Sequence, residues 1–103
     1  NRAGIKIHPE DLDILVEEST LATEACAFAI PDEIIGEMIG LAVVPEDHET
    51  FDLQGLKNWC GERLMKEKMP DKWFVVDEIP KTDRGKINRD NVASFCLKPR
   101  NNR

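Results

Sequence analysis

The sequence predicts a small α+β domain, in which helices pack on a three-stranded, mainly antiparallel sheet and a further short strand lies at the N-terminus. Three observations lead to this prediction. Apolar residues recur at helical spacing in three segments, strand-like apolar segments lie between them, and the connections are short. The 103 residues, of which 41% are hydrophobic, suit a single domain with one modest core.

The first two elements are a strand and a helix. Residues 4–8 alternate apolar and polar side chains, which predicts a short strand. Pro9 suits the first turn of a helix, because its missing N–H costs nothing there. Leu12 and Val16 follow at helical spacing, so we expect a helix over residues 9–18.

Two further strands should form a hairpin. In the segment 25–30, alanines occupy one face and Cys26, Phe28 and Ile30 the other, which indicates a strand with a helix packed closely on its alanine face. The segment 38–44 carries no charge and is predicted to be a central strand. The connection between them is short, so we expect the two strands to pair antiparallel.

The third strand of the sheet follows a second helix. Apolar residues recur at helical spacing from Leu53, and we expect this helix to stop at Met69–Pro70, because proline cannot continue it. Residues 73–76 are aromatic or β-branched, which favours a strand.

The chain is expected to end with a helix and a basic tail. Asn88 can cap a helix over residues 89–97, with Val92 and Phe95 directed inward. Residues 98–103 are predicted to be a flexible basic tail.

Charge and composition narrow the possible partners. A net charge of −6 argues against nucleic acid. No apolar run approaches the roughly 20 residues that a membrane helix requires, so we expect no membrane span. The chain begins at Asn1 without a methionine, and we expect it to be a fragment or a domain of a larger protein.

The cysteines and histidines indicate neither disulfides nor a metal site. Cys26, Cys60 and Cys96 are odd in number and form no CxxC pair, which is typical of buried free thiols in the cytoplasm or another reducing compartment. His8 and His48 lie far apart, and neither has ligand spacing to a cysteine. We therefore expect no metal site.

The loop at residues 80–86, Pro-Lys-Thr-Asp-Arg-Gly-Lys, is the segment with the most distinctive chemistry. Asp83 and Gly85 favour a turn, since Asp bonds the local backbone and Gly tolerates positive φ. Lys86 would then carry a point charge at the tip of an ordered turn, where it suits phosphate or another anion. An exposed, charged turn without function would have the same composition, so these residues alone leave both interpretations open.

Four motifs in register resemble the C-terminal part of the adenylate-forming (AMP-binding) enzymes, the superfamily of acyl-CoA synthetases, peptide-synthetase adenylation domains and luciferases. Acyl-CoA synthetases are the most similar group. The matching stretches are residues 1–13, similar to NRGGxKIxPxEIE, residues 31–37, similar to PDxxxGE, residues 68–70 before the third strand, and residues 80–89, similar to PxTxxGKxxR. Their order and spacing agree to about Ser94.

This resemblance implies that residues 1–103 form a mobile C-terminal lid domain. In this family a large N-terminal AMP-binding domain, not part of this chain, binds ATP with Mg²⁺ and a carboxylic acid. The carboxylate attacks the α-phosphate, which gives an acyl-adenylate and pyrophosphate. The lid then rotates, and the thiol of coenzyme A attacks the adenylate. The isolated chain is therefore expected to be inactive.

The resemblance also implies roles for individual residues. Lys86 corresponds to the catalytic lysine of adenylation, where a cation in a closed site stabilises charge on the α-phosphate and the acyl oxygen. Pro80, Thr82 and Gly85 belong to the loop that supports it. Arg89 is assigned to the same loop, and three interpretations stay open: it orients the loop, it holds phosphate, or it is a surface charge.

The thioester-forming face is implied at the other end of the chain. Gly4 corresponds to the glycine that faces the active site in that step, where the lack of a side chain leaves room for the pantetheine arm. Lys6 is assigned to the same face, directed to a phosphate of coenzyme A or to solvent. The family often has Gly-Gly where this chain has Ala3-Gly4, which leaves the local loop conformation open.

Two other functions are compatible with these motifs. A carrier-protein-loading adenylation domain needs the same cation and the same rotation. A non-catalytic interaction module would keep the fold without the chemistry, although such a module has no need of the intact loop. The acyl pocket would lie in the N-terminal domain, so the motifs leave the acyl substrate open.

Overall fold

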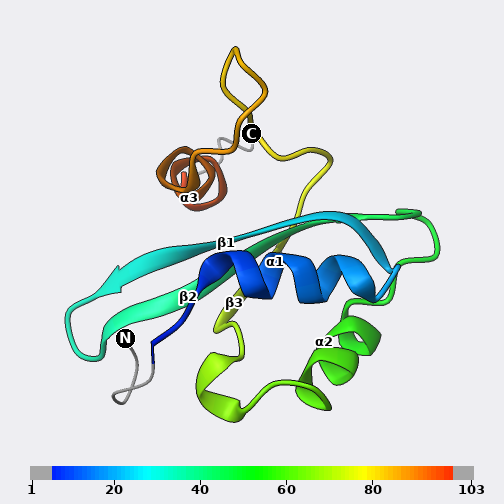
Figure 1. Cartoon of the computed structure of the whole chain (residues 1–103), viewed down its shortest axis with the longest axis horizontal. Helices are drawn as coiled ribbons and strands as arrows, with labels where there is room; N and C mark the ends of the chain where they lie inside the picture. The colour runs from blue at the N-terminus through cyan, green and yellow to red at the C-terminus, as the bar shows by residue number, and fades with distance from the viewer. Residues whose placement is uncertain (1–5, 99–103) are drawn as a thin grey trace, which may run out of the picture.

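A computed structural model describes residues 6–98 of the chain. A β-hairpin of two long strands forms the centre of the molecule, and a short third strand and three α-helices surround it (Figure 1). The elements in order are α1 (Pro9–Glu18), β1 (Ala22–Asp32), β2 (Gly36–Pro45), α2 (Leu53–Gly61), the 3₁₀ turn η1 (Lys66–Lys68), β3 (Lys72–Val75) and α3 (Arg89–Leu97). The helices predicted at 9–18 and 89–97 are confirmed with the same bounds.

The sheet has the order β1-β2-β3. β1 and β2 pair antiparallel, with Ala25 opposite Val43 and Ala27 opposite Leu41. β3 pairs parallel to β2 from Gly40 to Val43, and the connection through α2 and η1 is the crossover that a parallel pair requires. The predicted fold class, a small α+β domain with a three-stranded, mainly antiparallel sheet, is confirmed.

The sheet separates two apolar clusters. Ala25 and Ala27 of β1 face α1 and α2, where Val16 and Leu56 are fully buried. Cys26 and Phe28, which alternate with them along the strand, face the opposite side and pack with α3, β3 and the segment that follows β3. The predicted separation of alanines from larger side chains is confirmed, because small residues let α1 approach the strand closely.

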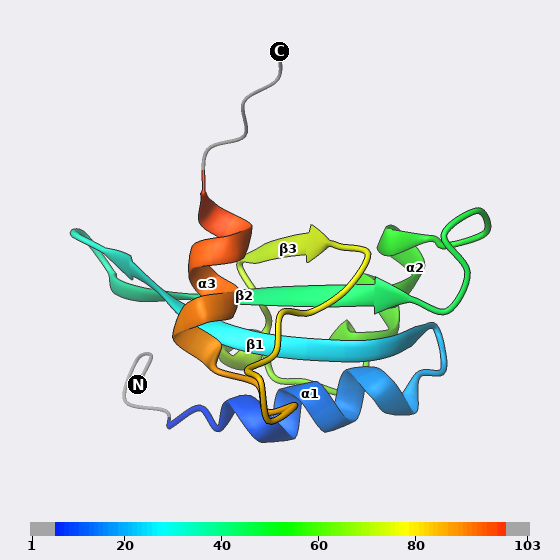
Figure 2. The ribbon, with the colours of Figure 1, turned by 90° about the horizontal axis from the view of Figure 1, so that it is seen from above.

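The outer edge of β1 is covered by carboxylates of α1. Figure 2 shows α1 running along this edge. The N–H of Ala27 donates to Asp13 Oδ1 at 2.7 Å, and the N–H of Ala25 donates to Glu17 Oε2 at 3.3 Å. These side chains occupy positions at which another strand would have to pair.

The short N-terminal strand is a prediction that the structure corrects. Residues 6–8 are not in a strand, and Gly4 and Ile5 lie outside the described residues. Alternation at residues 4–8 favours an extended chain, but a strand also needs a free ladder partner. The carboxylates of α1 already bond the outward N–H groups of Ala25 and Ala27 on β1.

Two smaller expectations also differ from the structure. α2 ends at Gly61, well before Met69, because the N–H groups of Arg63 and Leu64 both turn back to the Cys60 carbonyl, at 3.0 and 2.9 Å. Phe95 is 43% exposed rather than directed inward. Cys96, one helical turn after Val92, takes the inward position instead.

Three further expectations concern the C-terminal tail, the cysteines and a membrane span. The basic tail expected at 98–103 lies, apart from Lys98, outside the described residues. Cys26, Cys60 and Cys96 are buried thiols, as predicted. Within residues 6–98, no helix is long and apolar enough to cross a membrane.

Candidate functional site

The loop between β3 and α3 forms an ordered turn over residues 82–86. The N–H of Thr82 donates to the Lys86 carbonyl at 2.8 Å, and the N–H of Gly85 donates to the Thr82 carbonyl at 2.8 Å. The Thr82 hydroxyl accepts from the N–H of Lys86 at 3.2 Å. Gly85 has φ +80°, a conformation that glycine adopts at no steric cost. Figure 1 shows this turn standing clear of the sheet.

Lys86 leaves this turn with its side chain exposed. In the part of the chain that the structure describes, its ammonium group has no hydrogen-bond or ion-pair partner. A cation held by an ordered backbone and free at its head is available to an external anion. The arrangement can therefore supply positive charge and N–H donors to a phosphate or carboxylate.

The entrance to the loop is attached to β1. Ile79 is buried, and Pro80 after it is half-buried. The Lys81 ammonium lies 3.1 Å from both carboxylate oxygens of Glu24 on β1 and donates to the Ile79 carbonyl at 3.3 Å. Lys81 is thus already paired, in contrast to Lys86.

Arg89, at the start of α3, is neither a surface charge nor free to hold phosphate in this structure. Its Nη2 lies 2.8 Å from Asp13 Oδ2, and its Nη1 donates to the Ala27 carbonyl at 2.9 Å. Burial raises the pKa of Asp13, and the hydrogen bonds from Arg89 and Ala27 only partly oppose this effect. Burial alone would lower the pKa of Arg89, but the bond and charge of Asp13 raise it overall.

The start of α3 is fixed by its own cap. The Asn88 side chain accepts from the N–H of Asn91 at 3.1 Å, which confirms the predicted cap. Asn88 follows Lys86 by two residues, so the end of the loop and the start of the helix form one continuous ordered segment.

Of the two residues assigned to the thioester face, the structure describes only Lys6. Lys6 is exposed and lies in the extended segment before α1, and Gly4 lies outside the described residues. In Figure 1 the segment leading into α1 and the Lys86 turn lie on opposite sides of the sheet. The structure therefore separates the segment that leads into α1 from the Lys86 turn.

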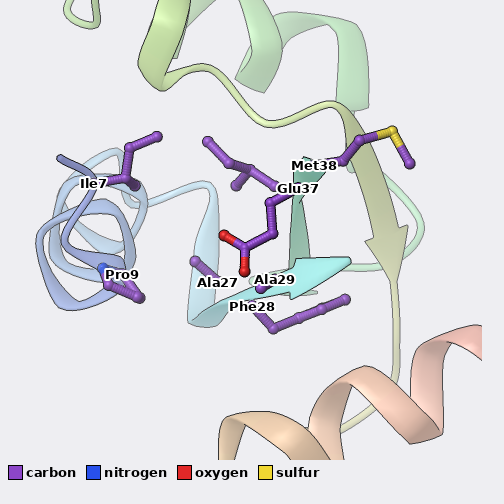
Figure 3. Close-up of a pocket in the computed structure, with 8 residues that line it drawn as sticks. Ile7, Pro9, Ala27, Phe28, Ala29, Glu37 and Met38 are labelled. Carbon is purple, nitrogen blue, oxygen red and sulfur yellow. The ribbon is translucent and has the colours of Figure 1, made fainter. Parts of the chain in front are cut away.

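A small cavity lies between the start of α1 and the strands β1 and β2 (Figure 3). Its lining is mostly apolar, and the Glu37 side chain points into it. The lining residues are Ile7, Pro9, Ala27, Phe28, Ala29, Glu37, Met38 and Ile39. None of them belongs to the Lys86 loop, so this cavity and the exposed cation are separate features.

Over residues 6–98, no group of three or more His, Cys, Asp or Glu side chains is arranged to hold a metal ion.

Sequence reasoning missed the partners of the two paired cations. Asp13 and Glu24 were not expected to contact the loop, since both lie far from it along the chain. One signal for Asp13 was present. It stands beside Leu12 and three residues before Val16, on the flank of the buried stripe, where a carboxylate needs a partner.

Comparison with known proteins assigns the family. Residues 14–86 match the family described as AMP-binding enzyme C-terminal domain. The chain is 38% identical over 97 residues to the "Probable CoA ligase CCL9" of Humulus lupulus, covering 94% of this chain and 18% of that protein. It is 37% identical to an oxalate–CoA ligase of Arabidopsis thaliana, covering 94% of this chain and 19% of that protein.

Solved structures agree with the sequence relatives. A Mycobacterium tuberculosis fatty acyl CoA synthetase superposes with a TM-score of 0.77 and 26% identity, over 91% of this chain and 19% of that one. The chain spans about a fifth of the length of the relatives it matches. It belongs to the AMP-binding enzyme C-terminal domain family and corresponds to the C-terminal domain of adenylate-forming enzymes of the acyl-CoA ligase type.

Proposed function

We propose that residues 1–103 are the mobile lid domain of an ATP-dependent acyl-CoA synthetase, and that Lys86 serves the adenylation step. The observation that carries this proposal is the contrast among the cations around the loop. Lys81 and Arg89 are paired with carboxylates, whereas Lys86 and Arg84 of the same turn are exposed and have no partner within residues 6–98. Of these two cations, Lys86 is the one that corresponds to the lysine of the PxTxxGKxxR motif. A lysine kept unpaired on an ordered turn suits an anion supplied from outside the domain.

The chemistry requires such a cation. A carboxylate oxygen of the acid attacks the α-phosphorus of ATP, the bond from this phosphorus to the bridging oxygen of pyrophosphate breaks, and the acyl-adenylate forms. Negative charge increases on the α-phosphate and on the leaving pyrophosphate as this bond breaks. The positive charge of Lys86 stabilises these oxygens, and its ammonium group donates hydrogen bonds to them. It transfers no proton. A preorganised donor in a closed site is worth about 10²- to 10³-fold in rate.

ATP and coenzyme A enter this proposal as substrates, and the N-terminal domain is the partner that holds them. The residues described here fit the phosphate oxygens of ATP through Lys86. They offer no set of metal ligands over residues 6–98, so Mg²⁺ is assigned to ATP and the N-terminal domain. When bound, Mg²⁺ would neutralise phosphate charge.

The second half-reaction uses the other end of the domain. After rotation, the sulfur of coenzyme A attacks the acyl carbonyl carbon, the bond to the adenylate oxygen breaks, and AMP leaves. We assign Gly4 to the face that admits the pantetheine arm and Lys6 to the same face. The separation of the segment that leads into α1 from the Lys86 turn supports a division of labour between two faces (Figure 1).

The test is a comparison of the two half-reactions in the full-length enzyme. Lys86→Ala is expected to lower ATP–pyrophosphate exchange by about 10²- to 10³-fold, because the charge on the phosphates loses its donor. Thioester formation from supplied acyl-adenylate should stay within about twofold. Lys66→Ala removes an exposed lysine from η1 and serves as the control for net charge. Equal loss of both half-reactions in Lys86→Ala would contradict the assigned role.

The full-length enzyme also serves to test which thiol accepts the acyl group. A carrier-protein-loading domain would transfer the acyl group to a phosphopantetheinyl carrier protein and not to free coenzyme A, whereas a synthetase would do the reverse. A non-catalytic module would show no ATP–pyrophosphate exchange with any carboxylic acid. The isolated chain of 103 residues is expected to form no acyl-adenylate, because the ATP and acyl sites are assigned to the N-terminal domain.

A further inference from the structure

Arg89 and Asp13 together bind both backbone groups of one residue in the edge strand. Asp13 Oδ1 accepts from the N–H of Ala27 at 2.7 Å, and Arg89 Nη1 donates to the carbonyl of Ala27 at 2.9 Å. The two side chains close the ring through Arg89 Nη2 and Asp13 Oδ2 at 2.8 Å. This clamp, Asp13–Arg89–Ala27, therefore joins α1, β1 and the first residue of α3.

The clamp is partly removed from water. Asp13 is 13% exposed and Arg89 29% exposed at the side chain. Taking these charges out of water is costly, and apolar side chains of similar size would often hold the elements together at least as well. A charged pair with directional bonds fixes the relative positions of the elements that it joins, in addition to any stability that it contributes.

That geometry concerns the Lys86 loop. Arg89 follows Lys86 by three residues, and the Asn88 cap makes the intervening segment part of an ordered helix start. The exit of the loop is thus attached to β1 at Ala27.

The entrance of the loop is attached to the same strand, since Lys81 bonds Glu24 on β1. Glu24 and Ala27 are three residues apart, about 10 Å along an extended strand. Figure 2 shows the chain crossing over β1 towards α1 before it turns back into α3.

We propose that Asp13 and Arg89 are positioning residues for adenylation, which hold the Lys86 turn in the direction needed to reach the α-phosphate. Lys81 and Glu24 support the other end of the turn. This inference rests on the proposed function of Lys86. Neither Asp13 nor Arg89 touches substrate, and both act through the placement of the turn. A displacement of a catalytic group by about 1 Å can cost about 10²-fold in rate.

The experiment uses the full-length enzyme with Arg89→Gln, Asp13→Asn and the double variant. Each single variant is expected to lower kcat for ATP–pyrophosphate exchange by about 10²-fold, while the thioester half-reaction from supplied acyl-adenylate stays within about twofold. The double variant should be no slower than either single variant, because the two residues form one unit. Hydrogen–deuterium exchange of the peptide 80–89 should become faster in all three, and exchange of the α2 peptide should not change.

Two control variants separate positioning from stability. Leu56→Ala creates a cavity at a fully buried residue of α2, a helix that supplies no residue of the clamp. Arg63→Gln removes an exposed arginine paired with Glu62. Both should keep the exchange activity at a temperature at which every variant is folded by circular dichroism, and neither should change exchange in residues 80–89.

The outcomes distinguish this inference from the proposed function. If Lys86→Ala abolishes exchange activity but Arg89→Gln and Asp13→Asn do not, the clamp has no positioning role. If Leu56→Ala reproduces the loss at the same melting temperature, or both half-reactions fall together, the clamp is structural only and the inference is wrong. If Lys86→Ala itself leaves exchange activity unchanged, the proposed function fails first.

Discussion

Two hydrogen bonds join Thr82 and Lys86. The N–H of Thr82 donates to the Lys86 carbonyl at 2.8 Å, and the N–H of Lys86 donates to the Thr82 hydroxyl at 3.2 Å. The second of these bonds depends on a side chain. A substitution at Thr82 can therefore weaken the backbone bonding of Lys86 and leave the charge of the Lys86 side chain unchanged.

Thr82→Val removes the hydroxyl and keeps the shape of the side chain. The loss of one hydrogen bond at an exposed turn costs about 0.5–1.5 kcal/mol. This cost lowers the equilibrium constant for forming the ordered turn by roughly 2- to 10-fold. We expect ATP–pyrophosphate exchange by the full-length enzyme to fall by a similar factor. Thr82→Ser keeps the acceptor and should stay close to the wild-type rate. A loss in Thr82→Ser as large as that in Thr82→Val would show that the hydroxyl bond is not the cause.

Gly85→Ala is expected to strain the turn. Gly85 has φ +80°, and an added Cβ would meet nothing within 4 Å, so the cost is conformational and not a clash. A left-handed conformation costs an alanine roughly 1–2 kcal/mol. The full-length enzyme should lose both melting temperature and adenylation rate, measured by thermal unfolding and pyrophosphate exchange.

Gly36 provides the matched control for this substitution. It has φ +92° at the tip of the β1–β2 hairpin, and an added Cβ would again meet nothing within 4 Å. Gly36→Ala should therefore cost similar stability, while the adenylation rate stays unchanged because the hairpin tip is far from the turn in Figure 1. Equal loss of rate in both variants would mean that strain at Gly85 acts through stability alone.

Gly40→Ala tests the packing between the hairpin strands and α3. An added Cβ would lie 2.5 Å from Phe28 Cε1, 2.7 Å from Phe28 Cζ and 2.9 Å from Ile30 Cδ1. The Phe28 ring cannot move freely, since it packs against Phe74 with ring centroids 5.8 Å apart. We expect a loss of about 1–3 kcal/mol in the free energy of unfolding, measured by urea denaturation.

Gly61→Ala is the control for the Gly40 substitution. Gly61 ends α2, has no positive φ, and an added Cβ would meet nothing within 4 Å. Alanine favours a helix over glycine, so this variant should be neutral or slightly more stable. Combining Gly40→Ala with Phe28→Leu should recover part of the loss, and no recovery would argue against the proposed clash.

The pH dependence of stability should carry a signature of Asp13. Burial raises its pKa above the ordinary 3.8, so the folded protein holds this proton more tightly than the unfolded chain does. Between pH 3.8 and the folded-state pKa, the contribution of Asp13 to stability therefore falls as the pH rises. The other charged neighbours are Arg89, which stays protonated, and Glu10 on the same helix. Cys26, with a pKa of about 11, is neutral throughout this range.

The measurement is a urea titration of wild type and Asp13→Asn from pH 4 to pH 7. The stability of wild type relative to Asp13→Asn should increase as the pH falls through the Asp13 titration. Adenylation should change in the opposite direction, because protonation of Asp13 removes the ion pair with Arg89. A stability difference that is independent of pH would contradict the raised pKa.

Much of this protein was determined by short stretches of its sequence. The helices at 9–18 and 89–97 follow from apolar spacing, a proline at the start of one and the Asn88 cap of the other, all of which act within a few residues. The turn around Gly85 follows from residues that are close together in the chain, and one of the four family motifs, at residues 80–89, contains this turn. Such features depend on local backbone preference, so one window of sequence contains their physical cause.

The tertiary structure alone decided which charges meet. Arg89 pairs with Asp13 only because the sheet register and the packing of α1 bring the start of α3 over Ala27. The same packing directs carboxylates of α1 to the outward N–H groups of Ala25 and Ala27, so another strand cannot pair with β1 at these two residues. Local sequence patterns predict that a charged residue is exposed. They contain no information on a partner that lies far along the chain. Among residues 6–98, the fold brings a carboxylate to Arg89 and none to Lys86.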